Sequence, residues 1–249
     1  MTDATPFALQ WAGLVAQVRL FGAHAPRATL VETDGMIASV MPTAPTSSLM
    51  NVALAVAPTA RPAALDQLSE RFRRGGARKW GLWVDAGDEA GREAARAQGM
   101  VLDSRPAGMV AELGELPFSH APVRMAVDFA TVGRVNDRAY DHAAPKLAPP
   151  IVALPANVLT YGSEHAGETA SVAMAFDIAA DTAVWFVATL PHARGKGLAR
   201  QTLQRLLIDA RERGQKTASL QASSAGQRLY ERLGFRSVGR LHLYEERFS

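Results

Sequence analysis

The sequence of 249 residues contains no cysteine. Disulfide bonds, thiolate nucleophiles and cysteine-based zinc sites are therefore excluded, and the composition is compatible with a reducing compartment. No apolar stretch approaches the ~20 residues that a membrane-spanning helix needs. The first twenty residues also lack a basic segment followed by an uninterrupted apolar run, which a secretion signal would have. We therefore expect a cytoplasmic protein without a membrane segment.

The chain has little excess of positive charge, since its net charge is +3. Its distribution is uneven: from residue 190 to the end, 12 Lys and Arg stand against 5 Asp and Glu, giving +7 and leaving −4 for the preceding residues. A solvated basic face is the simplest interpretation, and a site for a small polyanion is the sharper one. Aromatic residues that could stack bases are not interleaved with these basic residues, so we do not expect nucleic-acid binding. The six histidines show no metal-ligand spacing, so we expect no metal site.

The hydrophobic pattern predicts an α/β protein. The length exceeds that of a typical single domain, and the segment 113–123, with two prolines and a glycine, is the predicted boundary between domains at 1–115 and 122–249. Helices are predicted at 7–20, 62–74, 90–98, 129–140 and 198–213, strands at 28–31, 37–41, 51–56, 80–84, 123–127, 157–161, 169–176 and 184–190, and a Pro-rich loop at 144–155.

Three segments of the first half match three of the second half in the same order. AGREAARAQGMVLDS from Ala90 aligns with AGQRLYERLGFRSVG from Ala225. A Lys and a predicted short apolar strand precede each copy, KWGLWV at Lys79 and KTASLQ at Lys216. VAPTAR at 56–61 parallels TLPHAR further upstream. This order favours a duplication, although a shared strand and helix rhythm in an Ala- and Arg-rich chain remains an alternative.

The segment VWFVATLPHARGKGLA, at 184–199, predicts a buried strand that ends at a Gly-rich loop and leads directly into a helix. Gly195 and Gly197 remove side chains where a ligand must approach the backbone, and the first N–H groups of a helix have no intrahelical partners. This combination favours binding of a diphosphate, with Arg194, Lys196 and Arg200 adding charge. A Walker A loop and a GxGxxG dinucleotide motif are both absent.

The residues Arg194, Gly197 and Ala199 give this loop a resemblance to the GCN5-related N-acetyltransferases, whose signature is R or Q, two residues, G, one residue, then G or A. The segment SSAGQRLYERLGF, at 223–235, is similar to a later helix of the same family. The resemblance covers about 123–248. It implies an α/β fold of two tandem acetyltransferase-like domains, each with a mixed central sheet flanked by helices.

The resemblance also implies roles for particular residues, with acetyl-CoA as cosubstrate. The amide of Ala188 would polarise the thioester carbonyl, and Tyr230 would protonate the departing thiolate. Ser223 stands where the family usually has Asn, and its hydroxyl can bond the ligand or, in competition with Ser224, cap the helix. Val187, Ala188 and Thr189 would pair with pantetheine, and the pyrophosphate would lie on Arg194, Gly195, Lys196, Gly197, Leu198 and Ala199.

The general base is not identified by the sequence. A base is needed because an amine acceptor arrives as ammonium and must lose a proton before it attacks the thioester. Candidates by location alone are Glu164, His165, Glu168 and His192.

The first half lacks the residues that would carry the chemistry. RPAALD at 61–66 replaces RGKGLA, and Ala95 stands opposite Tyr230. We expect the first half to be a degenerate copy that shapes the acceptor cleft or extends the core. The Trp-rich strand 79–84 could line such a cleft, although a buried strand is the favoured interpretation.

The predicted function is transfer of an acetyl group to an amine of a small molecule or a protein, by direct attack in a ternary complex. The alternative is an acyl-CoA-binding sensor or structural protein without transfer activity. Both need the loop at 194–199, but only the enzyme needs Tyr230 and a base.

Overall fold

A computed structural model describes residues 5–33, 35–57, 62–122, 125–141, 145–151 and 154–248. The helices are α1 (Pro6–His24), α2 (Leu65–Arg74), α3 (Glu89–Ala97), α4 (Phe129–Ala139), α5 (Leu198–Glu212) and α6 (Gln227–Glu231). The strands are β1 (Thr29–Thr33), β2 (Met36–Val40), β3 (Val52–Ala55), β4 (Lys79–Asp85), β5 (Val101–Ser104), β6 (Ala107–Glu112), β7 (Val158–His165), β8 (Glu168–Ile178), β9 (Asp181–Thr189), β10 (Thr217–Ala222) and β11 (Arg236–Arg247). Short 3-10 turns η1 (Pro62–Ala64), η2 (Leu113–Glu115) and η3 (Pro191–Ala193) complete the order.

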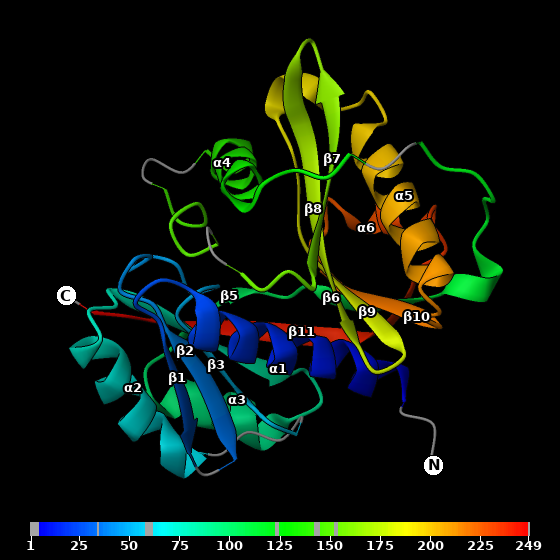
Figure 1. Ribbon diagram of the computed structural model, residues 1–249. Helices are drawn as coiled ribbons and strands as arrows, with labels where there is room; N and C mark the ends of the chain where they lie inside the picture. The colour runs from blue at the N-terminus through cyan, green and yellow to red at the C-terminus, as the bar shows by residue number, and fades with distance from the viewer. Residues whose placement is uncertain are drawn as a thin grey trace.

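The described strands form one mixed sheet in the order β1-β2-β3-β4-β11-β6-β10-β9-β8-β7, with β5 paired to β11 outside this path (Figure 1). Parallel pairing occurs between β3 and β4 and between β9 and β10, and the other pairs are antiparallel. The predicted α/β class with a mixed sheet flanked by helices is confirmed.

The two halves of the chain exchange strands. β6 belongs to the first half in sequence, yet it lies between β10 and β11. The first part of β11, residues 236–240, pairs with β6, and the second part, residues 241–247, pairs with β4 of the first half. Backbone hydrogen bonds therefore join the halves across the segment 113–123, and the division at 115 and 122 stays a prediction about sequence units.

Helix α1 lies between the two halves, and its sequence is apolar on nearly every side for that reason. Thr5 caps its first turn by accepting a hydrogen bond from Ala8 N–H at 3.3 Å. Its buried side chains include Trp11, Leu14 and Phe21, and the helix contacts β1 and β2 as well as β6 and β10. In Figure 1 the lower ends of β8 and β9 reach down to this helix, which contacts both strands.

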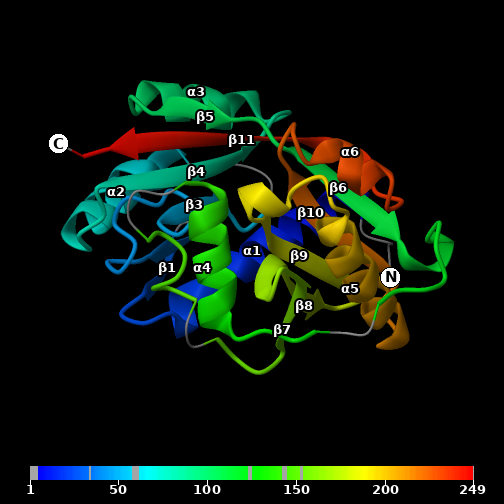
Figure 2. The same cartoon turned by 90° about the horizontal axis from the view of Figure 1, so that it is seen from above.

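The remaining helices cover the faces of the sheet. In the first half, α2 packs Leu68 and Phe72, and α3 packs Ala95, against the strands of the sheet. In the second half, α4 packs on one face of β8 and β9, while α5 packs Leu203 and Leu206 on the opposite face (Figure 2). None of the helices in the described ranges combines the length and hydropathy needed to span a bilayer.

The predicted helices and strands agree with the structure within a few residues at most positions, but three strands were not predicted. β5 has only four residues (VLDS), and β6 is rich in Ala and Gly (AGMVAE). β11 alternates charged residues with apolar ones (RSVGRLHLYEER), which obscures a strand at the centre of a sheet.

The predicted strand at 123–127 is wrong for its described part, whereas 123 and 124 lie outside the described residues. Met125 forms only an isolated bridge with Gly162. The hydroxyl of Thr160 donates to Val127 O at 2.5 Å and accepts from Val127 N–H at 3.3 Å, so a side chain takes the place of a strand partner.

The Pro-rich segment expected as a loop contributes to the core. In its described part, Leu147, Ile151 and Leu154 are buried against α4 and β8. The carboxylate of Asp137 accepts hydrogen bonds from the N–H groups of residues 146, 147 and 148 at 2.9, 3.0 and 3.0 Å. One buried carboxylate of α4 thus holds the segment in place.

Candidate active site

Strands β9 and β10 start as parallel neighbours and then separate. Their pairing ends at Ala183 and Ser219, and beyond that point the described residues of the two strands form no further pairs. β9 also contains a β-bulge, because its register to β8 shifts between Val172 and Met174, and Phe186 in the bulge has φ +52°. A bulge bends a strand and increases its twist, which accounts for the opening between β9 and β10.

A side chain of α4 holds the bulge. The amide Nδ2 of Asn136 donates to Phe186 O and to Val132 O, both at 3.0 Å. Asn136 is 1% exposed, so these bonds satisfy a buried donor. The sequence analysis did not identify Asn136, because nothing local to α4 reveals a partner fifty residues away.

The Gly-rich loop follows β9 and leads into α5. Gly195 and Gly197 have φ of +75° and +79°, values that side chains other than glycine rarely adopt. A Cβ added at either residue would meet no atom within 4 Å, so the loop faces open space. The first intrahelical bond of α5 joins Gln201 N–H to Gly197 O at 3.0 Å. The N–H groups of the residues just before Gln201 therefore remain donors for a ligand.

The cations of the loop have two different environments. Arg194 donates from Nε to Thr189 O at 3.2 Å and from a terminal nitrogen to Ala139 O at 2.6 Å. Its guanidinium thus ties the loop to the ends of β9 and α4. Lys196 and Arg200 are exposed and form no ion pair among the described residues, so their charges are available to an anion.

Tyr230 lies on the short helix α6, on the other side of the opening. Ser223 closes the turn before this helix, because its hydroxyl accepts from Gly226 N–H at 3.3 Å. Gly226 is the N-cap residue of α6, and no side chain among the described residues caps the helix. The ring of Tyr230 is buried and meets Phe235 edge-on, with 5.8 Å between centroids. Gly226 leaves space for the ring, since a Cβ there would lie 3.0 Å from Tyr230 Cε2.

Burial raises the pKa of Tyr230, and the neighbouring Tyr140 acts in the same direction. The hydroxyl of Tyr230 therefore stays protonated at neutral pH. Burial also raises the pKa of Tyr140, against the opposing effect of the Arg194 charge. The Tyr140 hydroxyl donates to Val187 O at 3.5 Å. Two tyrosine hydroxyl groups thus line the opening, of which the sequence analysis identified one.

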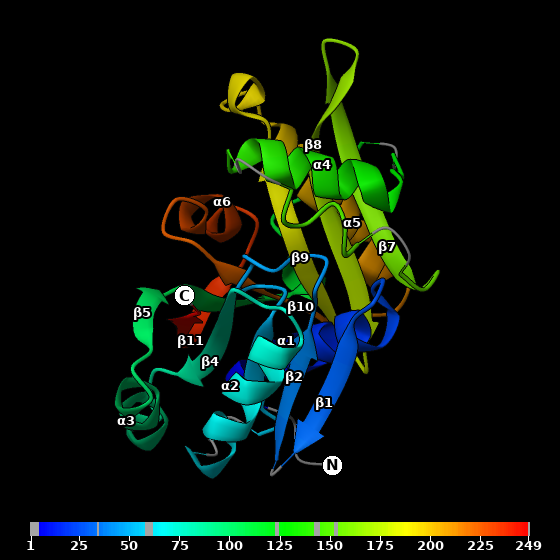
Figure 3. The same ribbon diagram turned by 90° about the vertical axis from the view of Figure 1, so that its left-hand side faces the viewer.

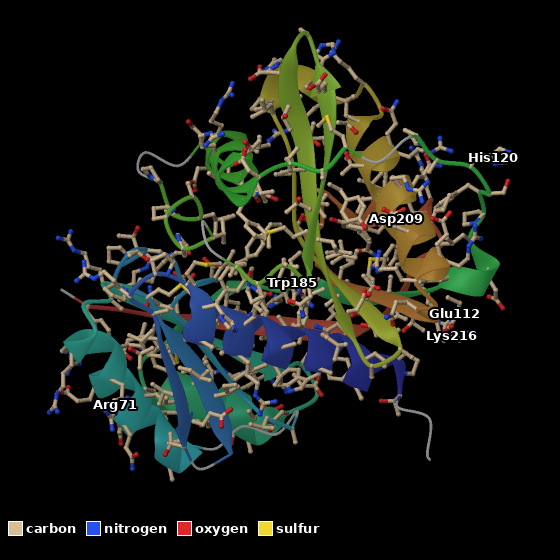
Figure 4. All side chains as sticks on the ribbon, viewed as in Figure 1. Arg71, Glu112, His120, Trp185, Asp209 and Lys216 are labelled. Carbon is tan, nitrogen blue, oxygen red and sulfur yellow. The ribbon has the colours of Figure 1, made fainter. Side chains whose placement is uncertain are left out.

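A cleft of ≈ 860 Å³ occupies the opening between β9 and β10 and extends to the first half. Its volume lies in the range of small-molecule sites. The second half contributes Val187, Ser223 and Tyr230, and the first half contributes Leu49 and Trp83. Figure 4 shows Trp185 of β9 where the second half meets α1, and its ring lies 6.4 Å from that of Phe21. The cleft is therefore bounded by both halves.

The structure locates the residues expected from the sequence as follows. Val187, Ala188 and Thr189 end β9, Arg194, Gly195, Lys196 and Gly197 form the loop, Leu198 and Ala199 begin α5, and Ser223 and Tyr230 flank the cleft from the side of α6. In the first half, Trp83 lines the cleft while Trp80 is buried in the core, and Arg61 lies outside the described residues.

None of the four candidate bases lines this cleft. They lie on or beside the β7–β8 hairpin, which rises away from the first half in Figure 3. Glu168 is paired with Arg138 at 2.8 Å and with His192 at 3.1 Å, and the bond from Arg138 is the main reason that the pKa of Glu168 is lowered. Among the described residues that line the cleft, Asp103 is the only carboxylate. No group of three or more potential metal ligands occurs in the described part of the chain.

Residues 158–237 match a family described as the acetyltransferase (GNAT) domain. A GCN5-related N-acetyltransferase from Kribbella flavida superposes with a TM-score of 0.68 at 20% identity and covers 95% of each chain. A structure described as a putative GNAT-family acetyltransferase, from Novosphingobium aromaticivorans, gives a TM-score of 0.64 at 20% identity over 99% of this chain and 100% of that one.

A tandem GNAT protein from the clavulanic acid biosynthesis pathway gives a TM-score of 0.53 at 15% identity, over 90% of this chain and 84% of its own. No curated protein sequence is significantly similar to the chain. The splayed strands, the glycine loop and the short tyrosine helix all lie within the matched segment 158–237. Residues 158–237 therefore match the acetyltransferase (GNAT) domain family, and over nearly its whole length the chain has the fold of the GCN5-related N-acetyltransferase structures.

Proposed function

We propose that the protein transfers an acetyl group from acetyl-CoA to an amine, with the catalytic site in the residues 122–249 and the residues 1–115 as a wall of the acceptor side. One observation carries this proposal: the opening between β9 and β10 lies directly before a loop with free N–H donors. An extended ligand with a diphosphate at one end fits this arrangement of a strand edge and a helix start.

The chain's own residues fit the parts of acetyl-CoA. The open space at Gly195 and Gly197 and the exposed charges of Lys196 and Arg200 suit its phosphates. Beyond Ala183 the edge of β9 has no partner from β10 among the described residues, and residues 187–189 of this edge suit the amides of the pantetheine arm. A bound arm would share the carbonyl groups of Val187 and Thr189 with Tyr140 and Arg194. By the family resemblance, the Ala188 amide is the candidate donor to the thioester carbonyl.

Tyr230 is the candidate proton donor to the thiolate that leaves. Its hydroxyl lines the cleft and is protonated at neutral pH, because burial raises its pKa. The sequence has no cysteine, so an acyl-cysteine intermediate is excluded. Direct attack by the amine on the thioester is the mechanism that these residues support.

The test is calorimetric titration with acetyl-CoA of the native protein and of two glycine variants. Gly197→Glu places bulk and negative charge where the diphosphate would lie. Gly214→Glu is a matched control, because Gly214 follows the other end of α5, has φ +92° and would also point its Cβ into open space. We expect saturable binding to the native protein and to the control, and a loss of at least about 100-fold for Gly197→Glu. Absence of binding to the native protein would refute the proposal.

The competing function is an acyl-CoA sensor without transfer activity. The two functions differ in thiol release, which is measured with acetyl-CoA and a panel of amines. Binding without amine-dependent thiol release across the panel would favour the sensor.

A further inference from the structure

Asp103 is the extra residue of a β-bulge in β5. Ser104 pairs with Leu243 and Leu102 pairs with Tyr244, so two consecutive residues of β11 face three residues of β5. Bulges re-aim side chains and are frequent beside active sites. The interrupted alternation explains how the consecutive residues 102–106 all line the cleft.

The carboxylate of Asp103 is exposed and forms no ion pair or hydrogen bond among the described residues. It is also the only negative charge in the described lining of the cleft, where Arg105 is the only positive one. A single cationic group entering the cleft therefore meets one free counter-charge, and Arg105 disfavours an acceptor with a second positive charge.

The wall beside Asp103 is apolar. Leu49 is 43% exposed, and Trp83 and Leu102 line the same cleft. An apolar group of a ligand would cover this surface and remove it from water.

We propose that Asp103 binds the ammonium group of the acceptor, and that the acceptor is a small primary amine with one positive charge and an apolar body. This inference rests on the proposed acetyl transfer for its biological meaning, but the binding itself can be measured without acetyl-CoA. The residue comes from the first half, so the first half selects the acceptor while the second half holds the acetyl donor.

The test uses 2-phenylethylamine and its neutral counterpart 2-phenylethanol, titrated by NMR against the native protein, Asp103→Asn and Glu93→Gln. Glu93 is a matched control, because it is also an exposed carboxylate of the first half without an ion pair in the described residues, but it lies outside the cleft. We expect Asp103→Asn to weaken binding of the amine by about 5-fold, as for an ion pair that keeps contact with water. Binding of the alcohol, and of the amine to Glu93→Gln, should stay unchanged.

Steady-state kinetics gives a second readout. Asp103→Asn should raise KM for the amine and leave kcat and the affinity for acetyl-CoA unchanged. Equal binding of amine and alcohol, no saturable binding of the amine, an unaltered KM in Asp103→Asn, or a preference for a lysine peptide over 2-phenylethylamine would each overturn the inference. Failure of acetyl-CoA to bind while the amine still depends on Asp103 would refute the acetyltransferase proposal alone, so the two failures are distinguishable.

Discussion

The junction of β3 and β4 in the first half and the junction of β9 and β10 in the second half have the same strand arrangement, but the first is filled by side chains and the second is open. In both, a parallel pair of strands is joined only at its start, and a helix side chain binds a carbonyl of the earlier strand. In the first half the indole Nε1 of Trp11 donates to Ala55 O at 3.0 Å, and the ring fills the space beside Leu54. In the second half the small amide of Asn136 holds the Phe186 carbonyl and leaves the space open.

The starts of the helices that follow β3 and β9 also differ in burial. α2 begins after Ala64, which is fully buried, whereas α5 begins after Gly197, which is exposed. Ala95 is buried in the first core, whereas Tyr230 lines a cleft. The same order of strands and helices can therefore enclose either a packed core or a cleft. A few side chains at the junction decide which of the two forms.

Replacement of Trp11 by Ala should have the largest effect on stability. It removes a buried indole and its hydrogen bond, and we expect the free energy of unfolding in urea to fall by about 3–5 kcal/mol. Val101→Ala, at a residue that is 69% exposed, serves as the control and should change it by less than about 0.5 kcal/mol. A gain of a second acetyl-CoA site in Trp11→Ala would contradict the view that the first junction lacks the other parts of a site.

Glu245→Gln should weaken the contact between the two halves. Glu245, on β11, is buried and accepts hydrogen bonds from Ser48 at 2.5 Å and Lys79 at 2.7 Å, both in the first half. We expect the free energy of unfolding at pH 7 to fall by about 3 kcal/mol.

These bonds, with that from Arg247, outweigh the effect of burial and lower the pKa of Glu245 below its ordinary value of 4.5. The stabilisation is therefore fully present above the pKa of the unfolded chain and is lost as the pH falls through the lower pKa of the folded protein. Urea titrations from pH 7 down to pH 3 should show the difference between native and Glu245→Gln shrinking only below about pH 4.5. A difference that is constant with pH would show that the charge of Glu245 does not stabilise the fold.

Tyr230→Phe tests whether the cleft at the junction of β9 and β10 is catalytic or only binds a ligand. It removes only the hydroxyl, and we expect kcat to fall by about 100-fold, or about 2.7 kcal/mol, with affinity for acetyl-CoA nearly unchanged. Thiol release and calorimetry measure the two quantities. Unaltered turnover would remove Tyr230 from the mechanism.

Ser223→Ala should have the smallest effect. It removes the hydroxyl that accepts from Gly226 N–H in the turn before α6, and we expect a loss of about 1 kcal/mol in the free energy of unfolding. Ser224→Ala is the control, since the bond to Gly226 is made by Ser223. A larger loss for Ser224→Ala than for Ser223→Ala would show that this bond does not stabilise the turn.

The local parts of this protein follow from the sequence alone. The loop with Gly195 and Gly197 and the helix that follows it were predicted, because positive φ values, free N–H groups at a helix start and helical periodicity depend on neighbouring residues. The short helix of Tyr230 was expected from the family resemblance of its segment. The degenerate loop of the first half was predicted in the same way.

The way in which the halves combine follows from the tertiary structure. The exchange of β6 and β11, the bulge at Phe186 held by Asn136, and the position of Asp103 and Leu49 at the cleft all depend on contacts between residues far apart in the chain. Strand pairing over such distances is set by the packing of the complete sheet and not by local pattern. The glycine loop and its helix were therefore predictable from sequence, and the wall that the first half contributes to the cleft was not.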